Sequence, residues 1–230
     1  VLDYAGYEVS REFYINDAGN QIDKFALSLD IRYQQIFKGE DAVELPEDSY
    51  HGEDIKVRAQ EFADVYGDKY IEADEAERRK ALVDFALPKN IKAMQDNLTK
   101  YRIEYDTWFH ESTLHNGTEL KDTLELMKEK GLTYEKDGAL WFRSTEYGDD
   151  KDRVLKKSDG TLSYLTPDIA NHVYKVERGY PTLIDLWGAD HHSYVTRMKA
   201  ALRALGYPED TLTVDLIQMV RMVEDGKEVK

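Results

Sequence analysis

The first forty residues change from a strand pattern to a helix pattern. Residues 7–15 are rich in aromatic and β-branched side chains, which favour strands. From Ile22 to Ile36, apolar side chains recur every three or four residues, and Gly39 follows. That spacing places them on one face of a helix, and glycine is common just after a helix end. We therefore predict a strand, a turn and a helix.

The helical spacing returns three times in the middle of the chain. It predicts helices over residues 53–66, 74–104 and 118–130. Two Asp-Gly pairs follow, at 137–138 and 159–160, each between strand-like arms. An Asp-Gly pair suits the tight turn of a β-hairpin, so two hairpins are expected after these helices.

Strands and helices alternate in the last part of the chain. Thr166 is expected to be the N-cap of a helix, because Pro167 follows it and proline suits the first helical position. Alternation of strands with helices predicts crossover connections and a parallel sheet, and hence an α/β fold. The elements expected after this helix are a strand over 182–187, a helix over 190–205 and a strand over 212–220.

Acidic side chains are concentrated in one segment. Residues 41–80 contain 13 acidic and 6 basic side chains, a net charge of −7, whereas the whole chain carries −15. Such a shift in composition marks an insertion. We expect a mostly helical insertion with a hairpin over 41–145, between two parts of one α/β domain at 1–40 and 146–230.

Several absences narrow the class of protein. The chain has no cysteine, which excludes disulfides and thiolate-bound metal. Its acidity argues against a stand-alone nucleic-acid-binding module. Because no run approaches the roughly 18 apolar residues of a membrane helix, we expect a cytoplasmic protein without a membrane partner. We predict neither a metal site nor a bound organic cofactor.

Gly188, Asp190 and His191 lie between a predicted strand and a predicted helix. Ligands of open parallel sheets bind outside the carboxyl ends of strands, and glycine permits close approach. Alternatively, Gly188 makes only the turn and Asp190 caps the helix, and the residues alone favour this structural role. Zinc binding by His191 and His192 is disfavoured, because neighbours on a helix diverge by about 100°.

Tyr164 and Asp168 are expected at the corner where a strand leads into a helix, so both can face one crevice. The structural alternative is that Tyr164 packs in the core. Asp168 would then only interact with the helix N-terminus, worth about 0.3–1 kcal/mol. Without further information this alternative is favoured.

Asn16, Asp17 and Gln21 follow the first predicted strand. They could line a ligand site at its carboxyl end, or Asn16 or Asp17 could only cap the next helix. The acidic residues 148–153 do not match a calcium loop, so we interpret them as a solvated turn that enters a hairpin.

Taken in order, several motifs resemble the catalytic region of bacterial arginyl-tRNA synthetase, a class I aminoacyl-tRNA synthetase. The resemblance covers nearly the whole chain and implies a Rossmann-like parallel sheet, with residues 41–145 as the connective insertion of the nucleotide-binding catalytic domain. The matching segments are residues 11–21 (REFYINDAGNQ), 148–155 (GDDKDRVL), 157–160 (KSDG), 164–170 (YLTPDIA), 186–192 (LWGADHH), 219–221 (MVR) and 226–230 (GKEVK).

The resemblance also implies substrates and residue roles. The parent enzyme would form arginyl-adenylate from arginine and ATP with Mg²⁺, and then transfer the arginyl group to tRNA. A guanidinium needs carboxylate acceptors in fork geometry, which the resemblance assigns to Asp168. The roles implied are arginine binding for Tyr164, Asp168 and His191, ATP binding for Gly188, Asp190, His191, Met219 and Val220, and lining of the site for Asn16, Asp17 and Gln21.

Both signature motifs of class I synthetases are expected outside this chain. The His-Ile-Gly-His type would lie before Val1, and Lys230 would be the first lysine of the Lys-Met-Ser-Lys type. The chain by itself is therefore expected to be inactive, with tRNA contacts mainly in domains beyond it. The alternatives left open are another class I-like nucleotidyltransferase and a non-catalytic acidic α/β interaction module.

Overall fold

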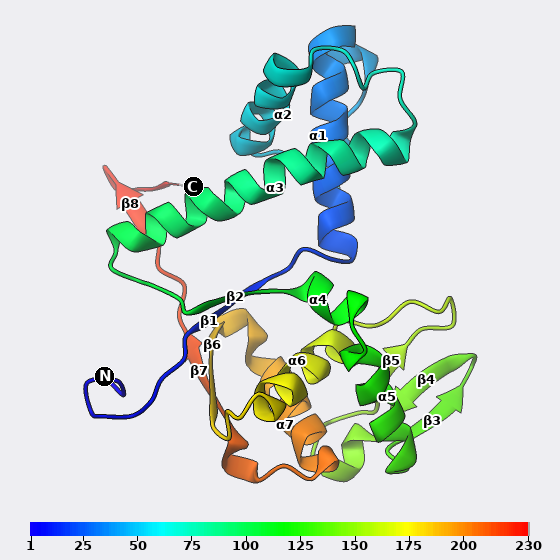
Figure 1. Ribbon diagram of the computed structural model, residues 1–230, viewed down its shortest axis with the longest axis vertical. Helices are drawn as coiled ribbons and strands as arrows, with labels where there is room; N and C mark the ends of the chain where they lie inside the picture. Colours follow the sequence, from blue (N-terminus) through cyan, green and yellow to red (C-terminus); the bar gives the residue numbers. More distant parts are fainter. Residues whose placement is uncertain (230) are drawn as a thin grey trace. The chain divides into compact units, whose positions relative to one another are not determined.

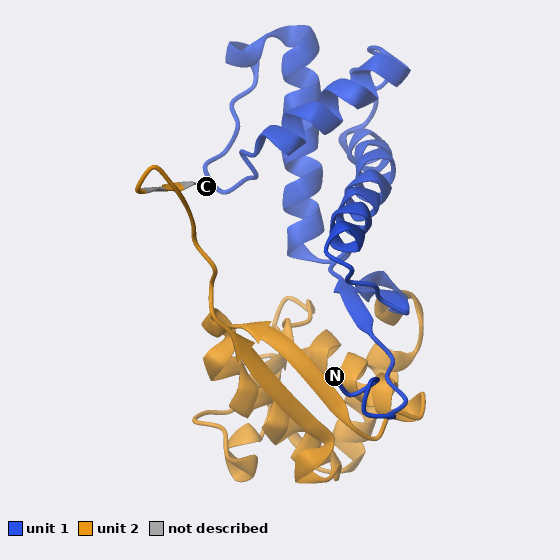
Figure 2. Cartoon of the chain, turned by 90° about the vertical axis from the view of Figure 1, so that its left-hand side faces the viewer, with its two compact units in different colours: residues 1–113 blue, residues 114–230 orange. Residues whose placement is uncertain are grey.

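The computed structural model describes residues 1–229, which form two compact units (Figure 2). The first contains residues 1–113, and the second contains the described residues from 114 onward. No helix within residues 1–229 has the length and apolar character that a bilayer crossing demands.

A short parallel strand pair belongs to the first unit (Figure 1). Strand β1 (Glu12–Ile15) pairs with β2 (Thr107–His110), in a register that joins Glu12 to Thr107. The predicted strand over 7–15 is confirmed only from Glu12 onward, because β2 supplies partners only from Thr107. Helix α4 (Glu111–Asn116) follows β2 directly.

Three helices fill the rest of the first unit. They are α1 (Asn20–Lys38), α2 (Glu53–Tyr66) and α3 (Glu75–Lys100), with a short 3₁₀ helix η1 (Glu40–Ala42) between α1 and α2. These helices confirm the predictions for this region, except that α3 ends at Lys100, four residues before the predicted end at residue 104. The side chains that hold them together are apolar and buried, and include Leu29, Tyr33, Phe62 and Leu82. The apolar spacing seen in the sequence is thus the packing face of each helix.

The second unit begins with α5 (Glu119–Glu129) and a three-stranded antiparallel sheet. Strands β3 (Thr133–Lys136) and β4 (Ala139–Phe142) form the first predicted hairpin, with Asp137 and Gly138 at positive φ angles of 53° and 74°. Both residues of a type I′ turn need positive φ, which Asp-Gly supplies. Strand β5 (Arg153–Lys156) pairs with β4, after the 3₁₀ helix η2 (Ser144–Tyr147).

The second predicted hairpin is reduced to a single bridge between Lys156 and Leu162. Helix α6 (Leu165–Glu177) begins before Thr166, so the prediction of Thr166 as its N-cap is wrong. The Thr166 hydroxyl instead donates to the carbonyl of Leu155 at 2.7 Å, and both residues are buried. This hydrogen bond therefore connects the start of α6 to β5.

A parallel pair of longer strands lies in the second unit, with helices on one side of it (Figure 2). Strand β6 (Leu183–Gly188) pairs with β7 (Leu212–Ile217) along its whole length. Between them run η3 (Ala189–His191), α7 (His192–Leu205) and η4 (Glu209–Thr211). The core consists of apolar side chains from α6, α7 and the strands, including Ile169, Leu183, Met198 and Leu212.

Strand β7 ends at Ile217, three residues before the predicted end at Val220. The last described elements are β8 (Met222–Glu224) and β9 (Lys227–Val229), which pair as an antiparallel hairpin. Asp225 and Gly226 make its turn at positive φ. The division of the sequence at residues 40 and 145 stays a prediction.

Candidate functional site

The carboxylate of Asp168 is the centre of the best-formed polar cluster in the second unit. Asp168 lies in the first turn of α6, where the helix dipole favours negative charge. The hydroxyl of Tyr194, on α7, donates a hydrogen bond to Asp168 Oδ2. Burial raises the pKa of Asp168, and the hydrogen bond from Tyr194 lowers this pKa by a smaller amount. The result is a partly buried acceptor that is held in place by the Tyr194 hydroxyl.

Tyr164 is the residue immediately before α6. Its side chain is exposed, at 60% of the full area, so the alternative that it packs in the core is wrong. Its φ and ψ angles are already helical, which places it about one turn before Asp168. Tyr164 is therefore free to meet a ligand that reaches the Asp168 carboxylate.

His172 joins Asp168 to a second carboxylate. Its Nδ1 lies 2.6 Å from the backbone oxygen of Asp168, and its Nε2 lies 2.7 Å from Asp185 Oδ2. A carbonyl oxygen and an ionised carboxylate are both hydrogen-bond acceptors, so each ring nitrogen of His172 faces an acceptor. Burial raises the pKa of Asp185, but the hydrogen bond and charge of His172 outweigh it and lower this pKa below its usual value. Lys175 adds positive charge 3.8 Å from Asp185 Oδ1.

The carboxyl end of β6 is Gly188, and Asp190 and His191 follow it in η3, as predicted. A Cβ on Gly188 would come within 2.5 Å of Asp190 Oδ1, so a larger residue would require the exposed Asp190 side chain to move. Asp190 makes no side-chain cap of α7, whose N-cap position is His191. The Asp190 carboxylate and His191 Nε2 are 3.7 Å apart, and both side chains are exposed.

His191 is connected to Asp168 through aromatic contacts. The ring centroids of His191 and Tyr194 are 6.4 Å apart, and Trp187 lies 6.3 Å from His191 and 5.7 Å from Tyr194. Asp168 and His191 thus both contact Tyr194, Asp168 at its hydroxyl and His191 at its ring. Within residues 1–229, no three His, Cys, Asp or Glu side chains are grouped as a metal site would need.

Met219 and Val220 are not at the end of a strand, contrary to the prediction. They lie between β7 and β8, and their side chains are 82% and 86% exposed. Their backbone groups lie outside the β6–β7 ladder, which ends at the pair Gly188 and Ile217. Lys230, the expected start of a lysine-rich signature, lies outside the described residues.

Asn16, Asp17 and Gln21 belong to the first unit. Neither Asn16 nor Asp17 caps α1, because the N-cap position is Gly19 and carries no side-chain bond. Asp17 instead accepts three hydrogen bonds at 2.8 Å, from His110 Nδ1 and from the backbone nitrogen and hydroxyl of Ser112. Burial raises the pKa of Asp17, but these donors outweigh it and the pKa is lowered. Asp17 therefore fixes the junction of β2 and α4.

Asn16 is partly buried, whereas Gln21 is exposed. With its amide oriented so that the nitrogen faces acceptors, Asn16 donates to Glu111 Oε2 at 3.0 Å. Gln21 is in the first turn of α1 and is exposed. Their role as lining of a ligand site stays a prediction.

The acidic turn at residues 148–153 is exposed at Gly148, Asp150 and Lys151 but buried at Asp149, which corrects the interpretation of a fully solvated turn. The Asp149 side chain is only 2% exposed and forms two hydrogen bonds with Arg153, at 2.7 and 2.8 Å. Burial raises the pKa of Asp149, but Arg153 outweighs it and holds this pKa far below its usual value. The pair anchors the loop between η2 and β5.

Sequence reasoning missed three members of the Asp168 cluster. His172 is one helical turn after Asp168, a spacing that places both on one face of α6. Asp185 is a charged residue inside an otherwise apolar strand, which by itself signals a partner. Tyr194 had no such signal, because a tyrosine in a helix usually serves in packing.

Comparison with known proteins gives a consistent picture. The family model described as "tRNA synthetases class I (R), catalytic domain" matches residues 1–230. The arginine–tRNA ligase of Caldanaerobacter subterraneus is 53% identical over 231 aligned residues, and arginine–tRNA ligase 1 of Halalkalibacterium halodurans is 50% identical over 230. These alignments cover 100% of this chain but 41% of each relative, so the chain spans about two-fifths of their length.

Solved structures agree with these sequence relatives. A Campylobacter jejuni crystal structure described as an arginyl-tRNA synthetase superposes with a TM-score of 0.89 and 38% identity, over 100% of this chain and 50% of that one. The Thermus thermophilus arginyl-tRNA synthetase gives a TM-score of 0.64 at 20% identity, over 94% of this chain and 43% of that one, which supports the fold alone.

Proposed function

The chain belongs to the family of class I arginyl-tRNA synthetase catalytic domains, and from this premise we propose that the whole protein activates arginine with ATP and transfers it to tRNA. The expected α/β, Rossmann-like class is that of the family. The proposed place of action is the cytoplasm. The proposal for the whole protein extends beyond this chain, which covers about 41% of such relatives.

The observation that carries the proposal is the partly buried carboxylate of Asp168, which the Tyr194 hydroxyl holds in place. A guanidinium is planar, always charged and rich in donors, so its binding site needs a fixed acceptor. Tyr194 occupies Oδ2 of Asp168, which leaves Oδ1 to accept from the guanidinium. Tyr164, exposed just before Asp168, would supply a ring or hydroxyl beside the same group. Lysine would be rejected, because an ammonium cannot reproduce the planar fork.

His191 and the β6 end provide the ATP side of this proposed site. Gly188 would let the nucleotide approach the backbone, with Asp190 and His191 beside it. Met219 and Val220 would contact adenine from the segment after β7. Mg²⁺ would enter with ATP, since this ion usually binds through substrate phosphates and retains water ligands.

Two group transfers make up the proposed reaction. The arginine carboxylate attacks the α-phosphorus of ATP, so that a new O–P bond forms and pyrophosphate leaves. A ribose hydroxyl at the end of tRNA then attacks the arginyl carbonyl and AMP leaves. The protein contributes alignment and positive charge near the phosphates. We propose that this chain alone does not perform the first step, because the family's two signature motifs are assigned outside it.

The experiment that tests the proposal compares two non-hydrolysable adenylate analogues. The whole protein should gain thermal stability with an arginyl-adenylate analogue and gain much less with the lysyl counterpart. The Asp168→Asn variant is the matched control, since it retains the shape of the side chain and removes its charge. Equal stabilisation by both analogues would count against arginine as the substrate.

A further inference from the structure

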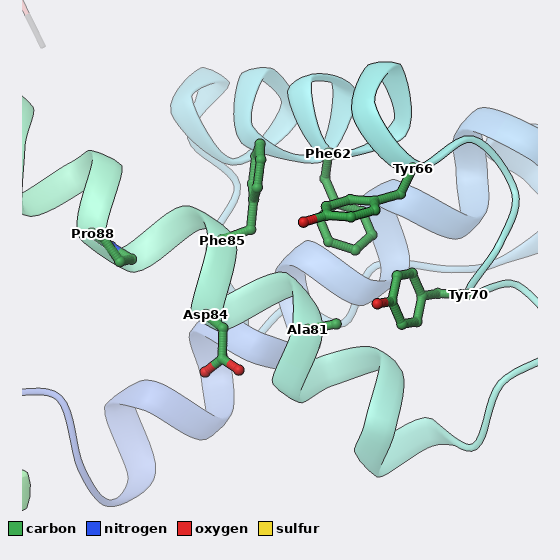
Figure 3. A pocket seen from close by; sticks show the side chains of 7 residues that line it. All are labelled: Phe62, Tyr66, Tyr70, Ala81, Asp84, Phe85 and Pro88. Carbon is green, nitrogen blue, oxygen red and sulfur yellow. The ribbon is translucent and has the colours of Figure 1, made fainter.

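A separate pocket lies within the three-helix part of the first unit (Figure 3). Its volume is about 380 Å³, within the usual range for small-ligand sites. None of its lining residues belongs to the candidate site described above. The lining consists of four aromatic side chains, one carboxylate and two small residues, namely Phe62, Tyr66, Tyr70, Phe85, Asp84, Ala81 and Pro88.

The aromatic rings are held by one another before any ligand binds. Phe62 is only 1% exposed and packs against Tyr66, Tyr70 and Phe85, with centroid distances of 4.7, 5.4 and 5.4 Å. Tyr66 and Phe85 also contact each other, at 6.0 Å. Contacts from α2, α3 and the turn between them therefore fix the pocket walls.

The pocket contains one carboxylate and two tyrosine hydroxyls, whose oxygens can accept hydrogen bonds from a ligand. Asp84 Oδ2 accepts from Lys80, whereas Asp84 Oδ1 has no partner within residues 1–229. Figure 3 shows the hydroxyl groups of Tyr66 and Tyr70 directed toward the side of the pocket where Phe85 and Ala81 lie. No cationic side chain is part of the described lining.

Ring faces carry negative electrostatic potential and attract cations. Two lysines outside the lining make cation–π contacts with these rings. Lys69 Nζ lies 4.9 Å from the ring centroid of Tyr70, and Lys89 Nζ lies 4.2 Å from the ring centroid of Phe85. The acidic residues 41–80, with a net charge of −7, surround α2 and would steer a positive ligand toward the unit. We propose that this pocket binds an arginine side chain from a basic segment of a partner protein.

The geometry fits a guanidinium better than a nucleic-acid base. A guanidinium stacks on aromatic faces and donates to a carboxylate, and this pocket offers both features. Aromatic rings also stack with bases, but a nucleic acid brings phosphates into an acidic segment, where like charges repel. The partner is therefore assigned as a basic polypeptide.

Binding can be measured with a fluorescein-labelled peptide of alternating Arg and Gly, by anisotropy, on the 230-residue chain. A peptide with citrulline in place of Arg removes the charge and keeps the shape. Salt near 0.15 M screens non-specific attraction between exposed charges. We expect binding of the Arg peptide and at least tenfold weaker binding of the citrulline peptide. An equal concentration of free arginine should leave the peptide bound.

Variants locate the binding site. Each of the variants Tyr66→Leu and Phe85→Leu should lower the affinity for the Arg peptide about five- to tenfold, as expected for loss of a partly buried cation–π contact. Tyr101→Leu is the matched control, because Tyr101 is an exposed aromatic residue at the end of α3 and outside the pocket, and should leave affinity unchanged. Circular dichroism checks that each variant is folded. If Phe85→Leu does not fold, the affinity of Tyr66→Leu alone tests the proposal.

Three results would overturn the proposal. They are equal affinity for the Arg and citrulline peptides, equal weakening by Tyr101→Leu and Tyr66→Leu, and displacement of the peptide by a single-stranded oligonucleotide or by free arginine. Each is distinct from failure of the arginine-activation proposal, because none involves Asp168 or an adenylate analogue.

Discussion

The hydroxyl of Tyr194 donates a hydrogen bond to the carboxylate of Asp168, although the two residues lie on different helices. The Tyr194 ring is itself held by Trp187 and by the guanidinium of Arg197, which lies 5.1 Å from the ring centroid. The position of the Asp168 carboxylate on α6 therefore depends on the position of Tyr194 on α7. This relationship makes Tyr194 a positioning residue for the proposed arginine site.

Replacing Tyr194 with phenylalanine should remove the hydrogen bond while retaining most ring contacts. The hydrogen bond lowers the pKa of Asp168, so its loss should raise that pKa further. Arginine affinity should fall by about 1 kcal/mol, the net contribution of a typical hydrogen bond, because Tyr194 positions Asp168 and is not itself the acceptor of the guanidinium. Calorimetric titration of the whole protein with arginine measures this loss. An unchanged affinity together with an unchanged pH profile would show that Asp168 is positioned without Tyr194.

Asp168→Ala should have a larger effect on the same measurement. It removes the charged acceptor itself, and we expect arginine binding to weaken by about 1.5–3 kcal/mol. Asp190→Ala is a useful comparison, because Asp190 is exposed and assigned to the ATP side. If both variants bind arginine as the unmodified protein does, Asp168 does not contact the guanidinium.

Arginine affinity should also depend on pH through Asp168. Burial raises the pKa of this carboxyl above its ordinary value of 3.8, and a guanidinium prefers the ionised form. Affinity should therefore be full above the raised pKa and should fall about tenfold per pH unit below it. His172, Asp185 and Lys175 also affect this carboxyl electrostatically, so Asp168→Asn is the control. The dependence on pH should largely disappear in that variant.

The sequence predicts the helices of this chain better than its polar clusters. Helix α2 begins and ends where its apolar spacing indicates, because the same side chains pack around Phe62. Thr166 was misassigned, since a buried hydrogen bond to Leu155 competes with helix capping and the helix starts earlier. Local rules decide which residues are helical, whereas tertiary contacts decide which side chain caps a helix.

Site prediction was limited for a similar reason. Asp168 could be chosen through the family resemblance, but its partner Tyr194 comes from α7, and Asp185, the partner of His172, comes from β6. No spacing rule connects residues that only the tertiary structure brings together. For Asp149 the error was different. Its acidic neighbours in the sequence suggested an exposed turn, whereas the structure has a buried ion pair between Asp149 and Arg153. Charge patterns describe average exposure and cannot identify a single desolvated ion pair.

The Asp149–Arg153 pair should contribute strongly to stability above pH 4. Removing one member of a buried pair leaves the other charge unpaired, and Asp149→Asn should cost about 3 kcal/mol of unfolding free energy. Asp150→Asn is the matched control, because the Asp150 side chain is 75% exposed although it also contacts Arg153, and it should cost less than about 1 kcal/mol.

The same pair predicts how stability varies with acidity. The pKa of Asp149 is lowered in the folded chain, so its contribution is present above the ordinary pKa of 3.8 and is lost as pH falls through the lower folded value. Urea unfolding between pH 5 and pH 2 should therefore show a decline in stability that is smaller in Asp149→Asn. A decline of equal size in both proteins would mean that other carboxylates govern acid unfolding and that this ion pair is energetically minor.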